Sequence, residues 1–249
     1  NLAVVRKGEY EALKAKLVDP KWQPDFGPAE FFKAKHTGAT AISARDFLIA
    51  YNVNLNTTST RRANAVAYDI REKGRIKRVG EVLSGDIVKD ADGNTLWTPG
   101  KLKHVKAIGW FIEEYGVTQV TMNITNITET PLHLAFDETA KAANARGIRA
   151  TGSELVGLVP KSAMLEAGKY FLRKQNRSTG IHESELIKIA IKSMGLDELG
   201  PFIPEERIIE YMLESGTDKK LVDLSLTDFA NETASESPAP GGGSISAYA

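Results

Sequence analysis

The chain has 249 residues, of which 42% are hydrophobic and 26% charged, values typical of a globular protein of one or two domains. Basic and acidic residues number 32 each, so the zero net charge provides no overall attraction to nucleic acid or to an anionic membrane. The absence of cysteine excludes disulfides and thiolate zinc sites. No apolar run reaches the roughly 20 residues that span a bilayer, and the charged start is unlike a signal peptide, so we expect a cytoplasmic protein.

The first hundred residues alternate between loop-rich and regular segments. Apolar residues at helical spacing predict a helix over 8–18, and Pro and Gly punctuate a long loop over 19–40. A strand is predicted over 47–55, and a helix with an apolar stripe is predicted over 58–74. Two short β-like runs flank an Asp-Gly pair and predict a hairpin over 79–98.

The next segments complete a regular pattern. Two strands are expected over 104–115 and 117–127, followed by a helix over 131–146 and a strand over 147–160. Three more helices are expected over 161–175, 183–194 and 204–214. With the first helix and the hairpin set aside, the order is β-α-β-β-α-β. This order predicts an α/β protein of the α+β sandwich type, with a ferredoxin-like sheet, helices on one of its faces and further helices at the C-terminal end.

The C-terminal segment differs in composition. Residues 215–238 are polar and contain Pro and Ser, which predicts a linker. Residues 239–249 begin with a Gly triplet that is typical of the start of a new element. Because the chain also begins with Asn1 rather than Met, we expect a fragment or a processed product.

Strand alternation predicts one polar, uncharged face on the sheet. In the first strand Asn52 and Asn54 alternate with apolar residues, and in the third strand Thr121 and Asn123 do the same. Amides and hydroxyls both donate and accept hydrogen bonds, which suits a pterin ring. Half-exposed antiparallel sheets commonly have such a face in contact with water alone, so both interpretations stand.

Charged candidates lie near the ends of the predicted strands. The basic clusters at 73–78 and 101–106, the second of which contains Lys103 and Lys106, could bind carboxylates or could be solvated surface. Glu154 follows Gly152 and Ser153 late in its strand, where it could face a site or cap a turn.

The four histidines are scattered along the chain, and none has metal-ligand spacing. His36 in the long loop is the one expected near a ligand, whereas His133, in a helix beside Leu132 and Leu134, is expected to be a packing or a surface residue. No G-x-S-x-G and no phosphate-loop motif occurs. We therefore expect no metal site, and the residues alone predict no catalytic group.

Several stretches together resemble the glutamate formimidoyltransferases. They run in the family's order from about residue 6 to 213, and GSELVGLVP and ARDFLIAYNVNL are the most distinctive. The others are RKGEYEALKAKL, DPKWQPDFGP, KLKHVKAIGWFIEEYGVTQVTMN and PFIPEERIIEY. The final residues, TDFANETASESPAPGGGSISAYA, resemble the linker and first loop of the cyclodeaminase domain of bifunctional relatives.

The resemblance implies transfer of a formimidoyl group from N-formimidoyl-L-glutamate to tetrahydrofolate, the co-substrate, in histidine degradation. In that family two subdomains face each other across a tunnel that binds both substrates, and the general-base histidine lies in the first subdomain. The resemblance therefore implies no catalytic residue in this chain. It implies folate contacts in the loop from Gly27 to Gly38, which also contains Pro28, Phe31 and His36, and it makes the polar sheet face a tunnel wall.

The implied domain boundaries are 1–40 for the end of the first subdomain with its folate-contacting loop, 41–214 for the C-terminal subdomain, 215–238 for a linker and 239–249 for the start of a cyclodeaminase domain. The insert at about 76–98 departs from the animal pattern. The expected partners are the small-molecule substrates and, through the full-length protein, further copies of itself. No nucleic acid and no membrane are expected.

Two alternatives remain. The same β-α-β-β-α-β order occurs in RNA-binding domains, which stack bases on aromatic residues of the central strands. The predicted strand 117–127 has no aromatic residue, which disfavours RNA binding. The second alternative is a non-catalytic folate-binding protein.

Overall fold

The computed structural model of the chain describes residues 2–8, 10–42, 44, 46–80, 84–214 and 224–235. These residues form two compact units, Asn1–Asp46 and Phe47–Ala249. None of the helices in the described ranges is long and apolar enough to cross a membrane.

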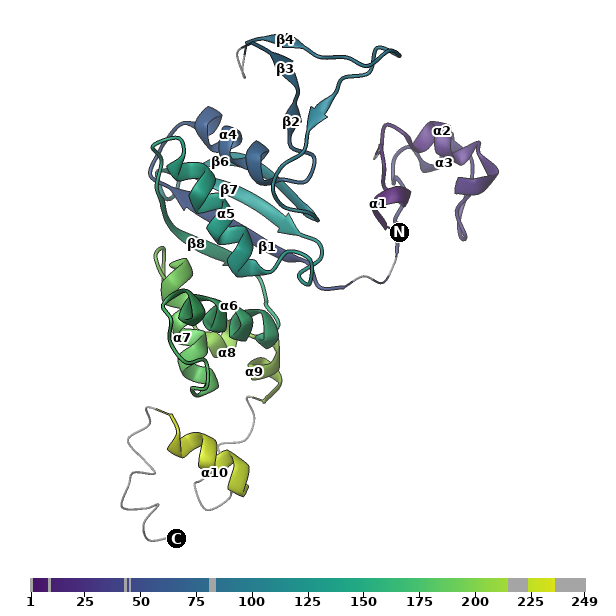
Figure 1. The fold of residues 1–249 in the computed structure, drawn as a ribbon. Coiled ribbons are helices and arrows are strands. Elements are labelled where there is room, and N and C mark those ends of the chain that lie inside the picture. Colours follow the sequence, from purple (N-terminus) through teal and green to yellow (C-terminus); the bar gives the residue numbers. More distant parts are fainter. Residues whose placement is uncertain are drawn as a thin grey trace. The chain divides into compact units, whose positions relative to one another are not determined.

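The first unit consists of short helical segments (Figure 1). They are α1 (Leu2–Val5), α2 (Leu13–Leu17), the 3₁₀ turn η1 (Pro20–Trp22) and α3 (Phe31–Ala34). The helix predicted over 8–18 is therefore shorter, and the predicted loop over 19–40 contains two helical turns. The Tyr10 ring lies against Phe31 at 6.2 Å between ring centroids, and its hydroxyl donates to the Lys35 carbonyl at 2.6 Å. These contacts join the segment before α2 to α3 and the residue that follows it.

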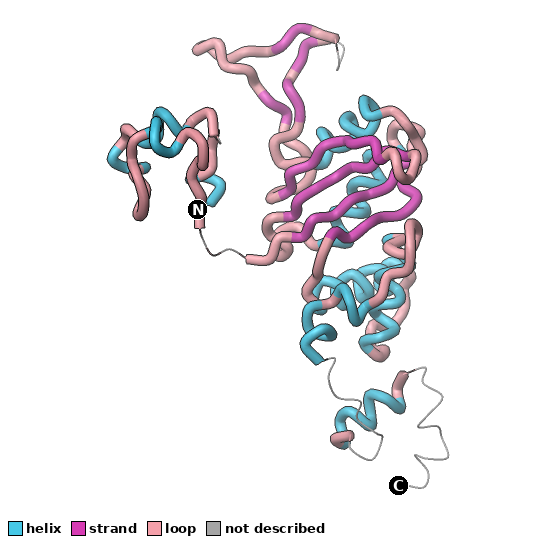
Figure 2. The backbone as a smooth tube through the Cα atoms, turned by 180° about the vertical axis from the view of Figure 1, so that it is seen from behind, coloured by secondary structure: helices cyan, strands magenta, loops and turns pink. Residues whose placement is uncertain are grey.

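The second unit is built on a four-stranded sheet (Figure 2). Its strands are β1 (Ile49–Leu55), β6 (Val105–Ile112), β7 (Val117–Ile124) and β8 (Ala150–Val156). Their order across the sheet is β6-β7-β1-β8, and every neighbouring pair is antiparallel. The ferredoxin-like prediction is confirmed, and all three strand pairings in the sheet are antiparallel.

Helices α4 (Thr60–Ile70) and α5 (Leu132–Asn144) cover one face of this sheet. The Ser59 side chain caps α4 by accepting from the backbone N–H of Arg62. The helix lies very close to β6 at Gly109, where any Cβ atom would overlap the backbone of Asn64. The predicted α4 stripe is fully buried and consists of Ala63, Val66, Ala67 and Ile70.

The remaining helices follow the sheet in sequence. They are α6 (Lys161–Lys174), α7 (Glu183–Met194), α8 (Pro204–Arg207), α9 (Ile209–Glu214) and α10 (Leu226–Thr233). The single helix predicted over 204–214 is divided because Ile208 is extended and pairs with Val159 in a parallel bridge. Helix α10 lies inside the predicted linker, capped by Ser225. Residues 215–223 and 236–249, including the expected cyclodeaminase start, lie outside the described residues.

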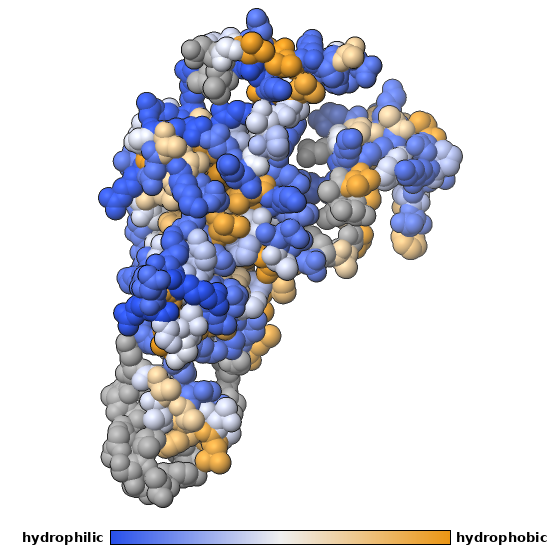
Figure 3. All heavy atoms as spheres, viewed as in Figure 1, coloured by the Kyte–Doolittle hydropathy of each residue, from blue (hydrophilic) through white to orange (hydrophobic). Residues whose placement is uncertain are grey.

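An extension projects between α4 and β6 (Figure 1). It contains two small ladders, made by β2 (Arg75–Ile76) with β5 (Trp97–Thr98) and by β3 (Arg78–Val79) with β4 (Asp86–Ile87). The predicted hairpin thus begins a few residues earlier than expected. The Asp-Gly turn is present and is held by Asp90, whose carboxylate accepts from Asp92 and Asn94. Apolar atoms are exposed on the extension in Figure 3.

Candidate functional site

One face of the sheet is left uncovered by helices, as Figure 2 shows. The strand registers arrange its side chains in three rows, written here from β6 through β7 and β1 to β8. The first row is Trp110, Gln119, Asn54 and Gly152; the second is Ile108, Thr121, Asn52 and Glu154; the third is Lys106, Asn123, Ala50 and Val156. We call these twelve positions the open face.

The alternation predicted from the sequence is confirmed by burial. On the helix side, Ile49, Tyr51, Val53 and Leu55 of β1 are at most 1% exposed. The intervening residues of β1 are therefore on the open face, because neighbouring side chains of a strand point to opposite sides.

A network of amides and carboxylates occupies the centre of the open face. Asn52 and Gln119 each donate to the same oxygen, Oε2 of Glu154, at 3.2 Å. Gln119 Nε2 also donates to Asn54 Oδ1 at 2.8 Å, and Asn54 Nδ2 donates to Glu198 Oε2 at 2.6 Å. Asn52 is 8% exposed, and Asn54 and Gln119 are fully buried. This part of the face does not simply meet water.

The network has more acceptors than donors. The Asn52 Oδ1 and Gln119 Oε1 atoms are buried without a hydrogen-bond partner. The orientation of each amide follows from its neighbour, because only an N–H₂ group can face a carboxylate favourably. Each amide oxygen must then point away from Glu154. An unsatisfied buried acceptor costs about 1–3 kcal/mol, so the network is poised to accept N–H or O–H donors.

Glu198 reaches the open face from the loop after α7. This loop runs along the free edge of β8, where Ser153 donates through its backbone N–H to the Gly195 carbonyl at 2.9 Å and through its hydroxyl to the Met194 carbonyl at 2.7 Å. Gly195 adopts φ 58°, a conformation that favours glycine, and ends α7. A Cβ atom at Gly195 would lie 2.7 Å from the Gly152 Cα atom, and one at Gly152 would lie 2.7 Å from the Gly195 carbonyl oxygen, so both positions need a residue without a side chain.

The negative and positive charges of the open face lie at opposite edges of the sheet. Glu154 and Glu198 lie toward the β8 edge, whereas Lys106 lies on β6 in the third row. The carboxylates of Glu154 and Glu114 raise the pKa of Tyr115 above its ordinary value. Negative potential therefore gathers at one edge, with a cation diagonally opposite.

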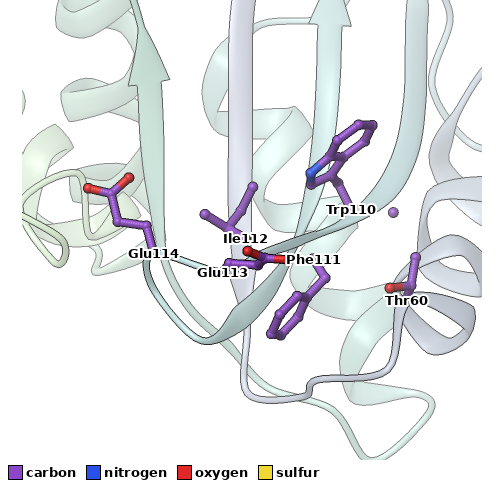
Figure 4. Close-up of a pocket in the computed structure, with 7 residues that line it drawn as sticks. Thr60, Trp110, Phe111, Ile112, Glu113 and Glu114 are labelled. Carbon is purple, nitrogen blue, oxygen red and sulfur yellow. The ribbon is translucent and has the colours of Figure 1, made fainter.

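The β6 edge provides an apolar platform. Ile108 is 45% exposed and Trp110 57% exposed, both on the open face. Figure 4 shows Trp110 and Phe111 pointing to opposite sides of β6 beside a surface hollow. The hollow is lined by Thr60, Gly109, Trp110, Phe111, Ile112, Glu113 and Glu114. A planar ring could lie against the exposed indole.

Six of the candidates in the second unit place a polar side chain on the open face. They are Asn52, Asn54, Lys106, Thr121, Asn123 and Glu154. Of these, Asn54 has both polar atoms engaged and is fully buried, so it positions its neighbours rather than meeting a ligand directly.

Three other candidates lie elsewhere or contribute differently. Ser153 is a correction, because it points to the opposite, helix-covered side, where it is 1% exposed and bonded to α7. Gly152 is on the open face but is buried beneath Glu198, so its role is close packing. Lys103 lies exposed in the loop before β6, outside the three rows, and its carbonyl accepts from Thr130.

The five candidates of the first unit belong to the segment around α3. Gly27 and Gly38 have positive φ, of 93° and 70°, and bracket a compact turn. Phe31 packs against Tyr10, Pro28 is exposed, and His36 is exposed.

His133 is a packing residue, one of the two roles that the sequence predicts. Its ring stacks on Tyr170 at 4.3 Å between centroids, and burial lowers its pKa. The Tyr170 hydroxyl donates to Asp137, and burial together with this bond raises the pKa of Tyr170 to about 12. Within the described residues, no group of three or more His, Cys, Asp or Glu side chains is placed to hold a metal ion.

Sequence reasoning missed three residues of the open face. Gln119 and Trp110 lie at alternate strand positions that share the open face with the predicted candidates. The alternation alone could have identified both. Glu198 follows α7 and gave no sequence signal, because only the fold brings its loop to the first row.

Comparison with known proteins identifies relatives over the whole chain. Residues 50–214 match the formiminotransferase domain, and residues 1–45 match the N-terminal subdomain of the formiminotransferase domain. The formimidoyltransferase-cyclodeaminase of Gallus gallus is 43% identical over 249 residues, which cover 100% of this chain and 42% of that protein. The Mus musculus protein of the same name is 40% identical over 247 residues, or 99% of this chain and 41% of that protein.

A shorter relative matches as well. The glutamate formimidoyltransferase of Thermoplasma acidophilum is 35% identical over 193 residues, which cover 76% of this chain and 54% of that protein. The chain thus spans about two fifths of the length of its cyclodeaminase-bearing relatives. On these matches, the chain belongs to the formiminotransferase domain family.

Proposed function

We propose that this chain provides the folate-binding C-terminal part of an enzyme that transfers the formimidoyl group from N-formimidoyl-L-glutamate to tetrahydrofolate. The observation that carries the proposal is the network on the open face of a chain of this family. In it, buried amides donate to two carboxylates, and two of the amide oxygens have no hydrogen-bond partner. Such a surface suits ligands whose rings have N–H edges. Tetrahydrofolate acts as co-substrate, and the proposal needs no metal.

In the proposed reaction this chain orients the substrates and contributes no catalytic group. The N5 atom of tetrahydrofolate attacks the formimidoyl carbon to give a tetrahedral intermediate. The bond to the glutamate nitrogen then breaks, and glutamate leaves as an amine after receiving a proton from a positioned acid. The family resemblance implies that the acid–base histidine belongs to the first subdomain. The open face contributes by holding the reacting groups together and stabilising charge.

Within this proposal the residues have different parts. Asn52, Thr121 and Asn123 contact the folate ring system, while Asn54 and Gln119 fix the positions of their neighbours. The loop over 27–38 contributes further folate contacts, and Lys103 and Lys106 interact with carboxylates of the substrates.

The proposal extends to the organisation of the protein. Residues 1–40 complete the first subdomain, 41–214 form the second, and 215–238 lead to a cyclodeaminase domain that starts at 239–249. The proposed enzyme is a cytoplasmic homo-oligomer whose ligands are the two small-molecule substrates.

RNA binding is disfavoured by the same face. The central strands β1 and β7 expose no aromatic side chain there, because Tyr51 points into the core. The carboxylates of Glu154 and Glu198 would also repel a phosphate backbone.

The test of the function is formimidoyl transfer measured in the full-length protein, meaning a protein of the relatives' length that contains this chain. We expect formation of 5-formimidoyltetrahydrofolate and release of glutamate. The 249-residue chain alone should give no turnover, because the proposed base lies outside it. A full-length protein without transfer activity would contradict the function, and turnover by the chain alone would contradict the division of roles.

A further inference from the structure

Hydrogen-bond acceptors and charges are unevenly distributed over the three rows of the open face. At the β8 edge, Asn52 Oδ1 and Gln119 Oε1 lack donors, and Glu154 accepts two hydrogen bonds through Oε2 alone. Within the described residues its Oε1 atom has no hydrogen-bond partner, and the side chain is half-buried. Three acceptors, one of them charged, therefore lie in this network without a matching donor.

A carboxylate flanked by unpaired amide oxygens selects a particular kind of ligand. An anion would be repelled, and a carbonyl group would add another acceptor to a site that has too many. A planar edge with two N–H donors fits, because it can bond a carboxylate in bidentate fashion, as guanidinium groups do.

The diagonally opposite corner has the complementary charge. Lys106 lies on β6 in the third row, and Glu154 lies on β8 in the second row. The two charged residues are therefore three strand spacings and one row apart. Normal sheet geometry makes this separation about 16 Å. The amides and hydroxyl of Asn123, Thr121 and Asn52 lie along the diagonal. An elongated ligand with a donor-bearing head and an anionic tail matches this arrangement.

We propose that Glu154, held in place by Asn52 and Gln119, binds a planar N–H donor edge of amidine or aminopyrimidine type, and that Lys106 binds the carboxylate end of the same class of ligand. This inference rests on the proposed function and deepens it by assigning the direction in which substrates lie. Two substrate groups have this chemistry: the protonated formimidoyl group and the pterin ring. Glu154 is thus a binding residue that discriminates by hydrogen-bond donors.

The head of the ligand is tested with Glu154→Gln in the full-length protein. The dissociation constants of N-formimidoyl-L-glutamate and of 5-formyltetrahydrofolate are measured separately by calorimetry. We expect Glu154→Gln to weaken at least one of them tenfold or more, and the affected ligand identifies the source of the donor edge. Glu205→Gln, which removes an exposed carboxylate from α8, outside the twelve positions of the open face, is the matched control and should change neither.

The tail is tested with Lys106→Met and a pair of pterin ligands. Affinity for 5-formyltetrahydrofolate should fall about tenfold, while affinity for the corresponding tetrahydropteroate, which lacks glutamate, should stay the same. Three results would overturn the assignment while leaving the proposed function intact. They are unchanged binding of both head probes in Glu154→Gln, equal losses in Glu205→Gln, and equal losses of both tail ligands in Lys106→Met. Absence of all binding by the wild-type protein would instead overturn the function itself.

Discussion

Replacing Asn54 with alanine is expected to lower the free energy of unfolding by about 2–3 kcal/mol. The side chain is fully buried and makes two hydrogen bonds, one of them to a carboxylate. Its removal leaves Glu198 without this donor and deprives Gln119 of an acceptor. Hydrogen bonds to charged groups contribute about 1.5–3 kcal/mol, so the loss should exceed that of an ordinary surface substitution.

The matched control is Asn123→Ala, on the same face of the neighbouring strand. Asn123 is exposed, so its replacement should change stability by no more than about 0.5 kcal/mol. Denaturant unfolding of both variants measures the difference. Equal effects would show that the network around Asn54 contributes nothing beyond a solvated surface.

Gly152→Val is expected to destabilise the protein by about 2–3 kcal/mol, since overpacking in a tight contact typically costs 1–3 kcal/mol. A Cβ atom at Gly152 would lie 2.7 Å from the Gly195 carbonyl oxygen and 2.8 Å from the Glu198 Cβ atom. The Gly195 carbonyl cannot retreat freely, because it accepts the backbone hydrogen bond from Ser153. The loop should therefore move away from β8 and take Glu198 off the open face.

Gly200→Val serves as the control for this substitution. Gly200 has no atom within 4 Å of its ideal Cβ position and no positive φ, so valine there should be nearly neutral. Thermal unfolding compares the two variants. If Gly152→Val left the melting temperature unchanged, the close contact between β8 and the α7 loop could not be what holds Glu198 in place.

The sequence predicted those parts of the fold that depend on local periodicity. The alternation in β1 identified both its buried and its polar side, and helix α7 was predicted with its observed limits, Glu183–Met194. Parity also indicated Asn52, Thr121 and Asn123 together, because antiparallel register keeps polar alternation on one face.

Features that depend on distant contacts were not predictable in this way. Ile208 interrupts the helix expected over 204–214 because Val159, far away in sequence, offers it a strand partner. Ser153 has the spacing of a site residue near Glu154, yet adjacent strand positions face opposite sides. Glu198 joins the open face through the Gly152–Gly195 contact, which no local pattern encodes.

The account's central claim is that the open face binds folate, and the most direct measurement is the affinity of the full-length protein for 5-formyltetrahydrofolate in Asn52→Ser and Asn123→Ser. Each substitution shortens a polar side chain on the open face and removes an amide that the ligand would meet. We predict about a tenfold loss of affinity in each, equivalent to about 1.4 kcal/mol. The melting temperature should stay close to that of the wild type in Asn123→Ser and fall in Asn52→Ser, which loses its hydrogen bond to the Glu154 carboxylate. Unchanged affinity in both variants would contradict the claim and make the open face an ordinary solvated sheet surface.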